Sequence, residues 1–382
     1  YFTCEDCGEV YPNEDGVIVN GSIRWLRTIY VCQSCADDDY FRCDDCGDYV
    51  SEQAIHRDDY DNYICEDCFN SAYTTCENCG RIIRTDDAHY RDGYAYCEDC
   101  APGNLAPNVF HDYSYKPEPD FKFRSSERKN AEGAGLVPQA SCDTFGVELE
   151  VDKGDNRRDL CNALTELAQP IYMKYDGSLG REGVEIVTHP CSLAYHMYEL
   201  RWAEIVRQAA RHGYKSHDAG TCGLHIHVGR LSLGQTYTAR REVAGRLVLL
   251  ADRLKTDLTT FSRRTAGQLD QWTPFPDMPD MTPACTEEEL VELALSTSRE
   301  GYHSDRYVAV NLTNTNTVEF RIFRGTLKRD TIIAPLQLVS NMVEYARTHT
   351  AQDCAFNASF ADILGVQPYK ELNTYAASRG LM

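Results

Sequence analysis

Twelve of the eighteen cysteines stand in Cys-x-x-Cys pairs, and all six pairs precede residue 101. Taken in order, they form three repeats, each with a leading pair, a gap of about twenty residues and a trailing pair. A glycine follows every leading pair, as a tight turn around a metal requires, because glycine tolerates a left-handed backbone. The three sets are Cys4, Cys7, Cys32, Cys35; Cys43, Cys46, Cys65, Cys68; and Cys76, Cys79, Cys97, Cys100.

This spacing predicts three structural zinc modules of the zinc-ribbon or treble-clef type. Two thiolates spaced by two residues converge on one ion, and two such pairs complete a closed tetrahedral shell. Metal binding then supplies folding energy that segments this small cannot draw from burial alone. The short connections favour sequential over interleaved pairing, and both remain open. A ladder of disulfides is the alternative, which six identical doublets without a secretion signal disfavour.

The charge is concentrated in the same region. Residues 1–100 hold 23 Asp and Glu against seven Arg and no Lys, a net charge of −16 out of −21 for the whole chain. An acidic region repels phosphate backbones, so we expect no nucleic acid here and predict a basic protein partner. No apolar run is long enough to cross a membrane and none opens the chain, which favours the cytoplasm, the host's if the gene is a phage gene.

The composition changes after the cysteine repeats. A stretch with several Pro and Gly and little periodicity reads as a linker. The six cysteines beyond it are scattered, and we interpret them as buried thiols. The expected organisation is zinc modules over 1–38, 39–71 and 72–103, a linker over 104–140 and a catalytic domain over 141–382.

Strands and helices alternate in the last domain. Apolar periodicity predicts strands over 145–151, 182–188 and 224–229, helices over 158–169, 192–212, 238–261, 287–300 and 332–348, and a hairpin of 307–312 with 317–323. Hairpins among helices indicate the α+β class, with an antiparallel or mixed sheet packed on helices.

Charged residues recur on one face of these strands. Alternate residues of a strand share a face, so Glu148 and Glu150 point together, as do His225 with His227 and Glu319 with Arg321. Glu185 lies within another apolar strand. A solvated outer sheet face is the ordinary explanation for any one such pair. Three strands with the same feature favour a site instead.

Four glutamates and two histidines on one sheet face need cations to neutralise them. A carboxylate-rich shell suits Mg²⁺, which bridges substrate phosphates. Arginines would hold the phosphate oxygens. The pattern therefore predicts phosphoryl chemistry with Mg²⁺.

Four stretches together resemble the amidoligases, the glutamine-synthetase-like carboxylate–amine ligases of bacteria and phages. They are FGVELE at 145–150, DGSL leading to EIVTHP at 176–190, CGLHIHVG at 222–229, and Asn311 followed by VEFRIFRGT at 318–326. The resemblance covers about residues 141–350 and leaves the zinc region outside. It implies a curved antiparallel sheet whose concave face holds ATP and metal ions.

The resemblance also implies roles. Metal ligands for Mg²⁺ would be Glu148, Glu150, Glu185, His225 and Glu319; catalytic residues would be Arg321, Arg324 and His227; and ATP would contact Arg321, Arg324 and Asn311. Asp176 and Ser178 fall where substrate could be met. The implied reaction makes an acyl phosphate from a carboxylate and ATP, and an amine then displaces phosphate to form an amide or isopeptide bond.

Two other functions stay open. His225, His227 and a glutamate could form the catalytic site of a zinc hydrolase, although the surplus glutamates and the arginines fit it poorly. Alternatively, the chain is a binding or structural protein whose ligase site has lapsed. The acid and amine substrates, whether amino acid, peptide or protein, are not named by the sequence.

Overall fold

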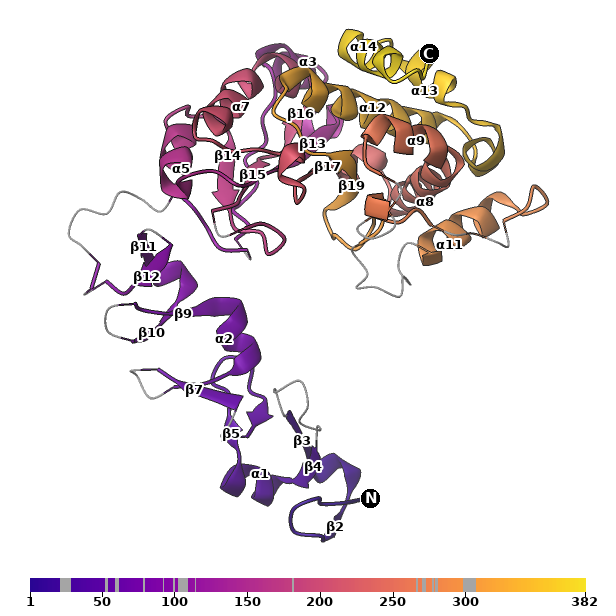
Figure 1. Ribbon diagram of the computed structural model, residues 1–382. Coiled ribbons are helices and arrows are strands. Elements are labelled where there is room, and N and C mark those ends of the chain that lie inside the picture. Colours follow the sequence, from indigo (N-terminus) through magenta and orange to yellow (C-terminus); the bar gives the residue numbers. More distant parts are fainter. Residues whose placement is uncertain are drawn as a thin grey trace. The chain divides into compact units, whose positions relative to one another are not determined.

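The computed structural model describes residues 1–20, 29–51, 54–58, 62–77, 80–91, 93–98, 100–101, 109–113, 115–180, 182–265, 267–269, 273–276, 278, 281–297 and 307–382. The chain divides into two compact units, Tyr1–Asn108 and Val109–Met382 (Figure 1). Within the described ranges, no helix combines the length and the apolar character that crossing a bilayer demands.

In its described residues, the first unit has short hairpins and two short helices. Its strands are β1 (Phe2–Thr3), β2 (Val10–Tyr11), β3 (Gly16–Asn20), β4 (Ile29–Cys32), β5 (Phe41–Arg42), β6 (Tyr49–Val50), β7 (Ile55–Arg57), β8 (Tyr63–Cys65), β9 (Tyr73–Thr75), β10 (Ile82–Arg84), β11 (His89–Arg91) and β12 (Tyr94–Tyr96). Its helices are α1 (Gln33–Asp39) and α2 (Glu66–Ala72), with 3-10 turns η1 (Asn13–Asp15) and η3 (Thr85–Asp87). Strand β3 pairs in parallel with β6, so the first two repeats share one sheet in the order β4-β3-β6-β5.

The leading cysteine pair of each repeat forms the same tight turn. Gly8, Gly47 and Gly80 follow the pairs with φ of 78°, 80° and 74°. Each of these glycines donates its N–H to the carbonyl of the pair's first cysteine, at 3.0, 2.8 and 2.8 Å respectively. A side chain at these positions would strain the left-handed backbone, which explains the glycine after every leading pair.

The second unit is built on one antiparallel sheet. Its order is β14 (Ile171–Lys174), β15 (Val184–Thr188), β13 (Thr144–Val151), β17 (Gly223–Gly229), β19 (Thr317–Arg324) and β18 (Val310–Asn311), and β16 (Cys191–Ser192) pairs with β13. The pairings among these strands are antiparallel. Val147, Leu149 and Val151 of β13 are fully buried in the large core between the sheet and the helices.

The described helices of the second unit lie around this sheet, some against its strands and others against further helices. They are α3 (Ser125–Gly133), α4 (Pro138–Ser141), α5 (Arg157–Thr165), α6 (Leu193–Tyr198), α7 (Trp202–Arg211), α8 (Tyr237–Arg253), α9 (Lys255–Ser262), α11 (Glu287–Thr297), α12 (Arg329–Thr348), α13 (Phe360–Val366) and α14 (Lys370–Ser378). Shorter turns are η4 (His217–Ala219), η5 (Arg230–Leu233) and the π-helical η6 (Asp353–Asn357). Contacts join α9 to β19, α12 to β17 and α5 to β14. This architecture confirms the predicted α+β class with an antiparallel sheet on helices.

Two predicted long helices are each divided. The helix expected over 192–212 is α6 and α7, because the backbone N–H of Arg201 donates to Gln169 Oε1 at 2.9 Å and opens a new helix there. The helix expected over 238–261 ends and restarts at Leu254, which is buried. The apolar periodicity continues through both breaks, so the sequence pattern does not reveal them.

The segment expected as a linker joins the second unit from residue 109 onward. His111 donates its backbone N–H to the Met173 carbonyl at 2.9 Å, and Lys122 donates to the Pro190 carbonyl at 2.9 Å. Helices α3 and α4 follow within the same segment. The expected boundary at 103/104 lies outside the described residues, and the module and domain boundaries remain predictions.

Candidate active site and cysteine clusters

The register of the sheet sets the charged residues of neighbouring strands opposite one another. Glu148 lies opposite His225 across β13 and β17, and His227 lies opposite Glu319 across β17 and β19. Directly paired residues of an antiparallel sheet project their side chains to the same face. The alternation of each strand therefore adds up to one charged face across the middle of the sheet.

A second pair of acids continues this face toward the sheet edge. Glu150 lies opposite Glu185, and Glu185 lies opposite Lys174 on the edge strand β14. Lys174 Nζ is 3.1 Å from Glu185 Oε2, and Glu185 is only 2% exposed. The lysine thus supplies a positive charge next to a buried carboxyl group.

All the residues singled out in the second unit line one cavity of about 1280 Å³. They are Glu148, Glu150, Asp176, Ser178, Glu185, His225, His227, Asn311, Glu319, Arg321 and Arg324. Residues from five strands and the loop after β14 meet there, although they are spread over nearly 180 positions in the chain (about 148 to 324). The charged sheet face thus forms one wall of this open cavity.

Glu148, His227 and Glu319 form a compact group in this cavity. Each offers a ligand atom, and these atoms lie within 4.8 Å of one another. His227 Nε2 is 3.2 Å from Glu148 Oε1 and 4.0 Å from Glu319 Oε1. His225 adjoins them, with Nδ1 3.2 Å from Glu148 Oε2. Two carboxylates and an imidazole at this separation fit a divalent cation.

Burial and mutual charge shift the pKa values of these groups. Burial raises the pKa of Glu148, but His227 and His225 outweigh it and hold that pKa well below its ordinary value. Burial lowers the pKa of His227, yet Glu148 and Glu319 leave it raised. Burial also raises the pKa of Glu319, and His227 with Arg321 brings it below its ordinary value. Glu148 and Glu319 are therefore carboxylates, the form that binds metal.

Neighbouring amides hold Glu319 in place. Asn311 Nδ2 donates to Glu319 Oε2 at 2.9 Å, and Asn314 Nδ2 donates to the same oxygen at 3.2 Å. The other end of the Asn311 amide accepts from the backbone N–H of Thr313 at 2.9 Å. Asn311 lines the cavity, and its amide is turned toward Glu319. Such outer contacts fix the orientation of a ligating carboxylate.

Two predicted arginines lie at the β19 side of the cavity. Arg321 donates to Glu319 Oε1 and its guanidinium lies 5.6 Å from the centre of the Tyr307 ring. Arg324 lines the cavity three residues further along β19, near its end. Burial lowers the pKa of Arg324 from its ordinary value, and Arg263 acts in the same direction.

Several lining residues escape sequence reasoning. Lys174 stands in the short strand β14, whose four residues carry no clear alternation, and only its register with Glu185 reveals it. Tyr113 and Lys116 come from the expected linker, and the Tyr113 carbonyl accepts from Lys174 Nζ at 3.3 Å. Arg264 comes from the segment after α9, where no strand pattern marks it.

A cysteine also lines the cavity without the features of a nucleophile. Burial raises the pKa of Cys222 to about 12, so its side chain is a neutral thiol at physiological pH. A nucleophilic cysteine needs a lowered pKa. Cys222 is buried among apolar neighbours that include Leu179 and Ala219.

The cysteines of the first unit converge in sequential groups. Cys4, Cys7, Cys32 and Cys35 form one group, Cys43, Cys46, Cys65 and Cys68 form the second, and Cys76, Cys97 and Cys100 form the third. Cys79 lies outside the described residues. In each of the first two repeats a strand ends at the third cysteine, which caps a short helix carrying the fourth. The pairing that the sequence left open is therefore sequential.

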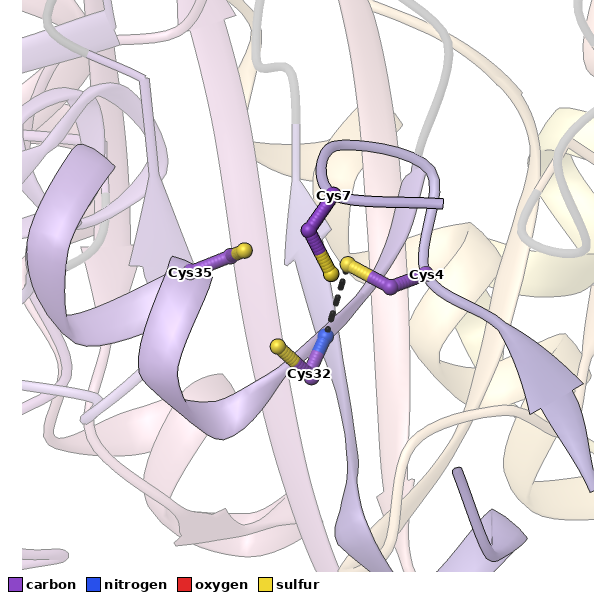
Figure 2. A group of neighbouring side chains, drawn as sticks. All are labelled: Cys4, Cys7, Cys32 and Cys35. Carbon is purple, nitrogen blue, oxygen red and sulfur yellow. Dashed lines mark hydrogen bonds between the residues drawn. The ribbon is translucent and has the colours of Figure 1, made fainter. Parts of the chain in front are cut away.

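Backbone N–H groups point at the sulfur atoms of these groups. Cys32 N donates to Cys4 Sγ at 3.3 Å, the bond drawn in Figure 2, and Cys65 N donates to Cys43 Sγ at 3.3 Å. Burial raises the pKa of Cys4, but backbone donors outweigh it and bring that pKa to about 6. The pKa of Cys43 is lowered to about 7 in the same way. Four convergent sulfurs, with the thiolates of Cys4 and Cys43 stabilised by backbone donors, fit Zn²⁺.

Comparison with protein families assigns a family to the part of the chain that forms this cavity. Residues 115–343 match the family model described as "Putative amidoligase enzyme". A search among curated proteins gives no match.

Solved structures give weak likenesses. "Apo GmaS without ligand" is 13% identical with a TM-score of 0.36, covering 67% of this chain and 70% of that one. A bifunctional glutathione synthetase from Pasteurella multocida is 13% identical with a TM-score of 0.32, covering 68% and 48%. The complex of the prokaryotic ubiquitin-like protein Pup and its ligase PafA is 10% identical with a TM-score of 0.29, covering 59% and 51%. The assignment of the chain rests on the family model alone.

Proposed function

Because the chain belongs to the amidoligase family, an amide-bond-forming family, we propose that it is an ATP- and Mg²⁺-dependent carboxylate–amine ligase. The observation that carries this proposal is the convergence of Glu148, His227 and Glu319 in a cavity bordered by arginines. A cavity of about 1280 Å³ has room for a nucleotide together with a second substrate.

In this proposal the acidic middle of the sheet holds the cation. The proposed ligands are Glu148, Glu319 and His227, whose ligand atoms lie close together. The same cavity is also lined by Glu150, Glu185 and His225. Mg²⁺ there would neutralise the phosphates and position them for in-line transfer. Arg321 and Arg324 would hold the phosphate oxygens, since a guanidinium matches them with two parallel hydrogen bonds.

The proposed reaction needs no nucleophile from the protein. A substrate carboxylate attacks the γ-phosphorus of ATP, which releases ADP and leaves an acyl phosphate. An amine then attacks the acyl carbon, phosphate departs, and the amine loses a proton as the amide or isopeptide bond forms. The protein's part is positioning and electrostatic stabilisation, which suits a site made of fixed charges.

We also propose that each cysteine group binds one structural Zn²⁺ and that the acidic surface of this unit docks a basic protein partner or substrate. The net charge of −16 over residues 1–100 supports this choice of partner. Deleting residues 1–100 should weaken capture of a protein substrate and leave ATP affinity unchanged. Equal loss of both would contradict the docking role.

A zinc hydrolase remains the competing function, because one histidine and two carboxylates can also hold Zn²⁺. The two activities differ in their requirements. We expect ATP consumption with Mg²⁺ that depends on both an acid and an amine, with an amide product in mass spectra. Hydrolysis with Zn²⁺ and no nucleotide would instead favour the hydrolase.

A further inference from the structure

Arg264 reaches the cavity from outside the sheet. It follows α9, and its backbone N–H donates to Ser262 Oγ at 3.1 Å, which fixes the chain just past the helix end. Its side chain lines the cavity alongside Glu150 and Arg321.

The absence of a side chain at Gly223 makes room for this guanidinium. A Cβ at Gly223 would lie 2.4 Å from one terminal nitrogen of Arg264, 3.1 Å from His225 Nε2 and 3.4 Å from Glu150 Oε2. Three charged or polar groups therefore meet over the first residue of β17. His225 in turn contacts Glu148 of the Glu148–His227–Glu319 group. Arg264 consequently lies at the border of that group.

The guanidinium of Arg264 has no hydrogen-bond acceptor among the residues that the structure describes. Within the part of the chain that the structure describes, it makes no hydrogen bond and no ion pair. Glu150, its acidic neighbour, instead accepts from the backbone N–H of Gly223. Burial lowers the pKa of Arg264, Glu150 opposes this, and Arg321 adds to the lowering. Arg264 is half-buried, and its guanidinium lines the cavity beside a second cation, Arg321, so an anion bound there could accept hydrogen bonds from both groups.

We propose that Arg264 binds the phosphate group of ATP that lies beside the Glu148–His227–Glu319 group. This inference rests on the proposed function and adds a phosphate contact that no sequence pattern indicates. Phosphate is the anion that fits, because the planar fork of a guanidinium takes two phosphate oxygens at once. Arg264 and Arg321 would then approach the same phosphate chain from α9 and β19, which explains why two guanidinium groups share this part of the cavity.

Isothermal titration calorimetry of the full chain with Mg²⁺ and AMPPNP tests the proposal. We expect Arg264→Gln to weaken AMPPNP binding by roughly tenfold to a hundredfold, the value of one charge-assisted contact. AMP, which lacks the outer phosphates, should bind both proteins alike. Arg264→Lys keeps the charge but not the planar fork, so its affinity for AMPPNP should lie between those of the unaltered chain and Arg264→Gln. Arg240→Gln is the matched control, since Arg240 of α8 donates to the carbonyl of Thr236, which caps that helix, and is not among the cavity-lining residues.

A second variant tests the geometry without removing the charge. As a single substitution, Gly223→Ala should displace the guanidinium and weaken AMPPNP binding. Added to Arg264→Gln, it should weaken AMPPNP binding little further. If the unaltered chain binds AMPPNP and Arg264→Gln binds it within twofold, with both proteins equally stable to heat, the role of Arg264 is refuted. If the unaltered chain binds no nucleotide, the proposed function fails and this inference with it.

Discussion

Replacing Glu148 with Gln should remove most of the stabilisation by Mg²⁺ and nucleotide, in addition to any change in the stability of the ligand-free protein. In the ligand-free protein, Glu148 attracts His225 and His227 through contacts of 3.2 Å each. It also repels the buried Glu185, whose pKa is raised by burial and by Glu148. The two histidines outweigh this repulsion and hold the pKa of Glu148 well below its ordinary value, so removing the charge should also destabilise the ligand-free protein.

The ligand-dependent effect comes in addition to this destabilisation. A ligand at a hundred times its Kd stabilises the native state by about 2.7 kcal/mol. For a unit of this size, 1 kcal/mol raises Tm by about 2–4 °C, so the expected rise is about 5–10 °C. Loss of one of three clustered ligands should weaken metal–nucleotide binding about a hundredfold. At the same ligand concentration the stabilisation then falls to RT ln 2, about 0.4 kcal/mol, or about 1 °C in Tm.

Thermal unfolding followed by circular dichroism, with and without Mg²⁺ and AMPPNP, measures both effects. Glu288→Gln is the control, because Glu288 is exposed on α11 and is not among the cavity-lining residues. The control should keep the full rise in Tm. The reasoning is wrong if Glu148→Gln retains a rise of several degrees, or if the control loses it.

Further predictions concern the zinc modules and one buried histidine. The full chain should contain three zinc ions by plasma mass spectrometry, and Cys4→Ser should contain two; an unchanged content would count against the first module. Burial lowers the pKa of His196 to about 4, and its Nε2–H donates to the Phe145 carbonyl at 3.0 Å. His196 takes up a proton below about pH 6.5 in the unfolded state but only near pH 4 in the folded state. The stability of the folded protein is therefore unaffected by this histidine above pH 6.5. It should fall by about 1.4 kcal/mol per pH unit between these values. His196→Gln should flatten that part of the urea-unfolding profile against pH, and an unchanged slope would refute the assignment.

The sequence predicts the central strands and their charged face because the alternation of apolar and charged residues along a strand is visible in the sequence itself. In β13, β17 and the first part of β19 apolar residues alternate with others, and the charged members of that second set line the cavity: Glu148, Glu150, His225, His227, Glu319 and Arg321. It does not reveal which strands are neighbours, so it cannot show that Glu148 lies opposite His225 while Glu150 lies opposite Glu185. Register depends on tertiary contacts across the sheet.

Residues outside regular patterns are the ones that sequence reasoning misses. Arg264 enters the cavity from a segment between helices, and Tyr113 does so from a segment whose Pro and Gly suggest a linker. Their roles depend on where the fold brings the chain, and not on their neighbours in sequence. The spacing of the cysteines is different, because a metal site with two local pairs is nearly complete within the sequence itself.

The location of the metal tests the account most directly. Crystals of the full chain soaked with Mn²⁺ and AMPPNP would locate the metal by its anomalous scattering. We predict a peak bound by Glu148 and Glu319 inside the cavity, with the nucleotide phosphates between that peak and Arg264. A nucleotide bound elsewhere, or no metal at these carboxylates, would contradict the proposed ligase site.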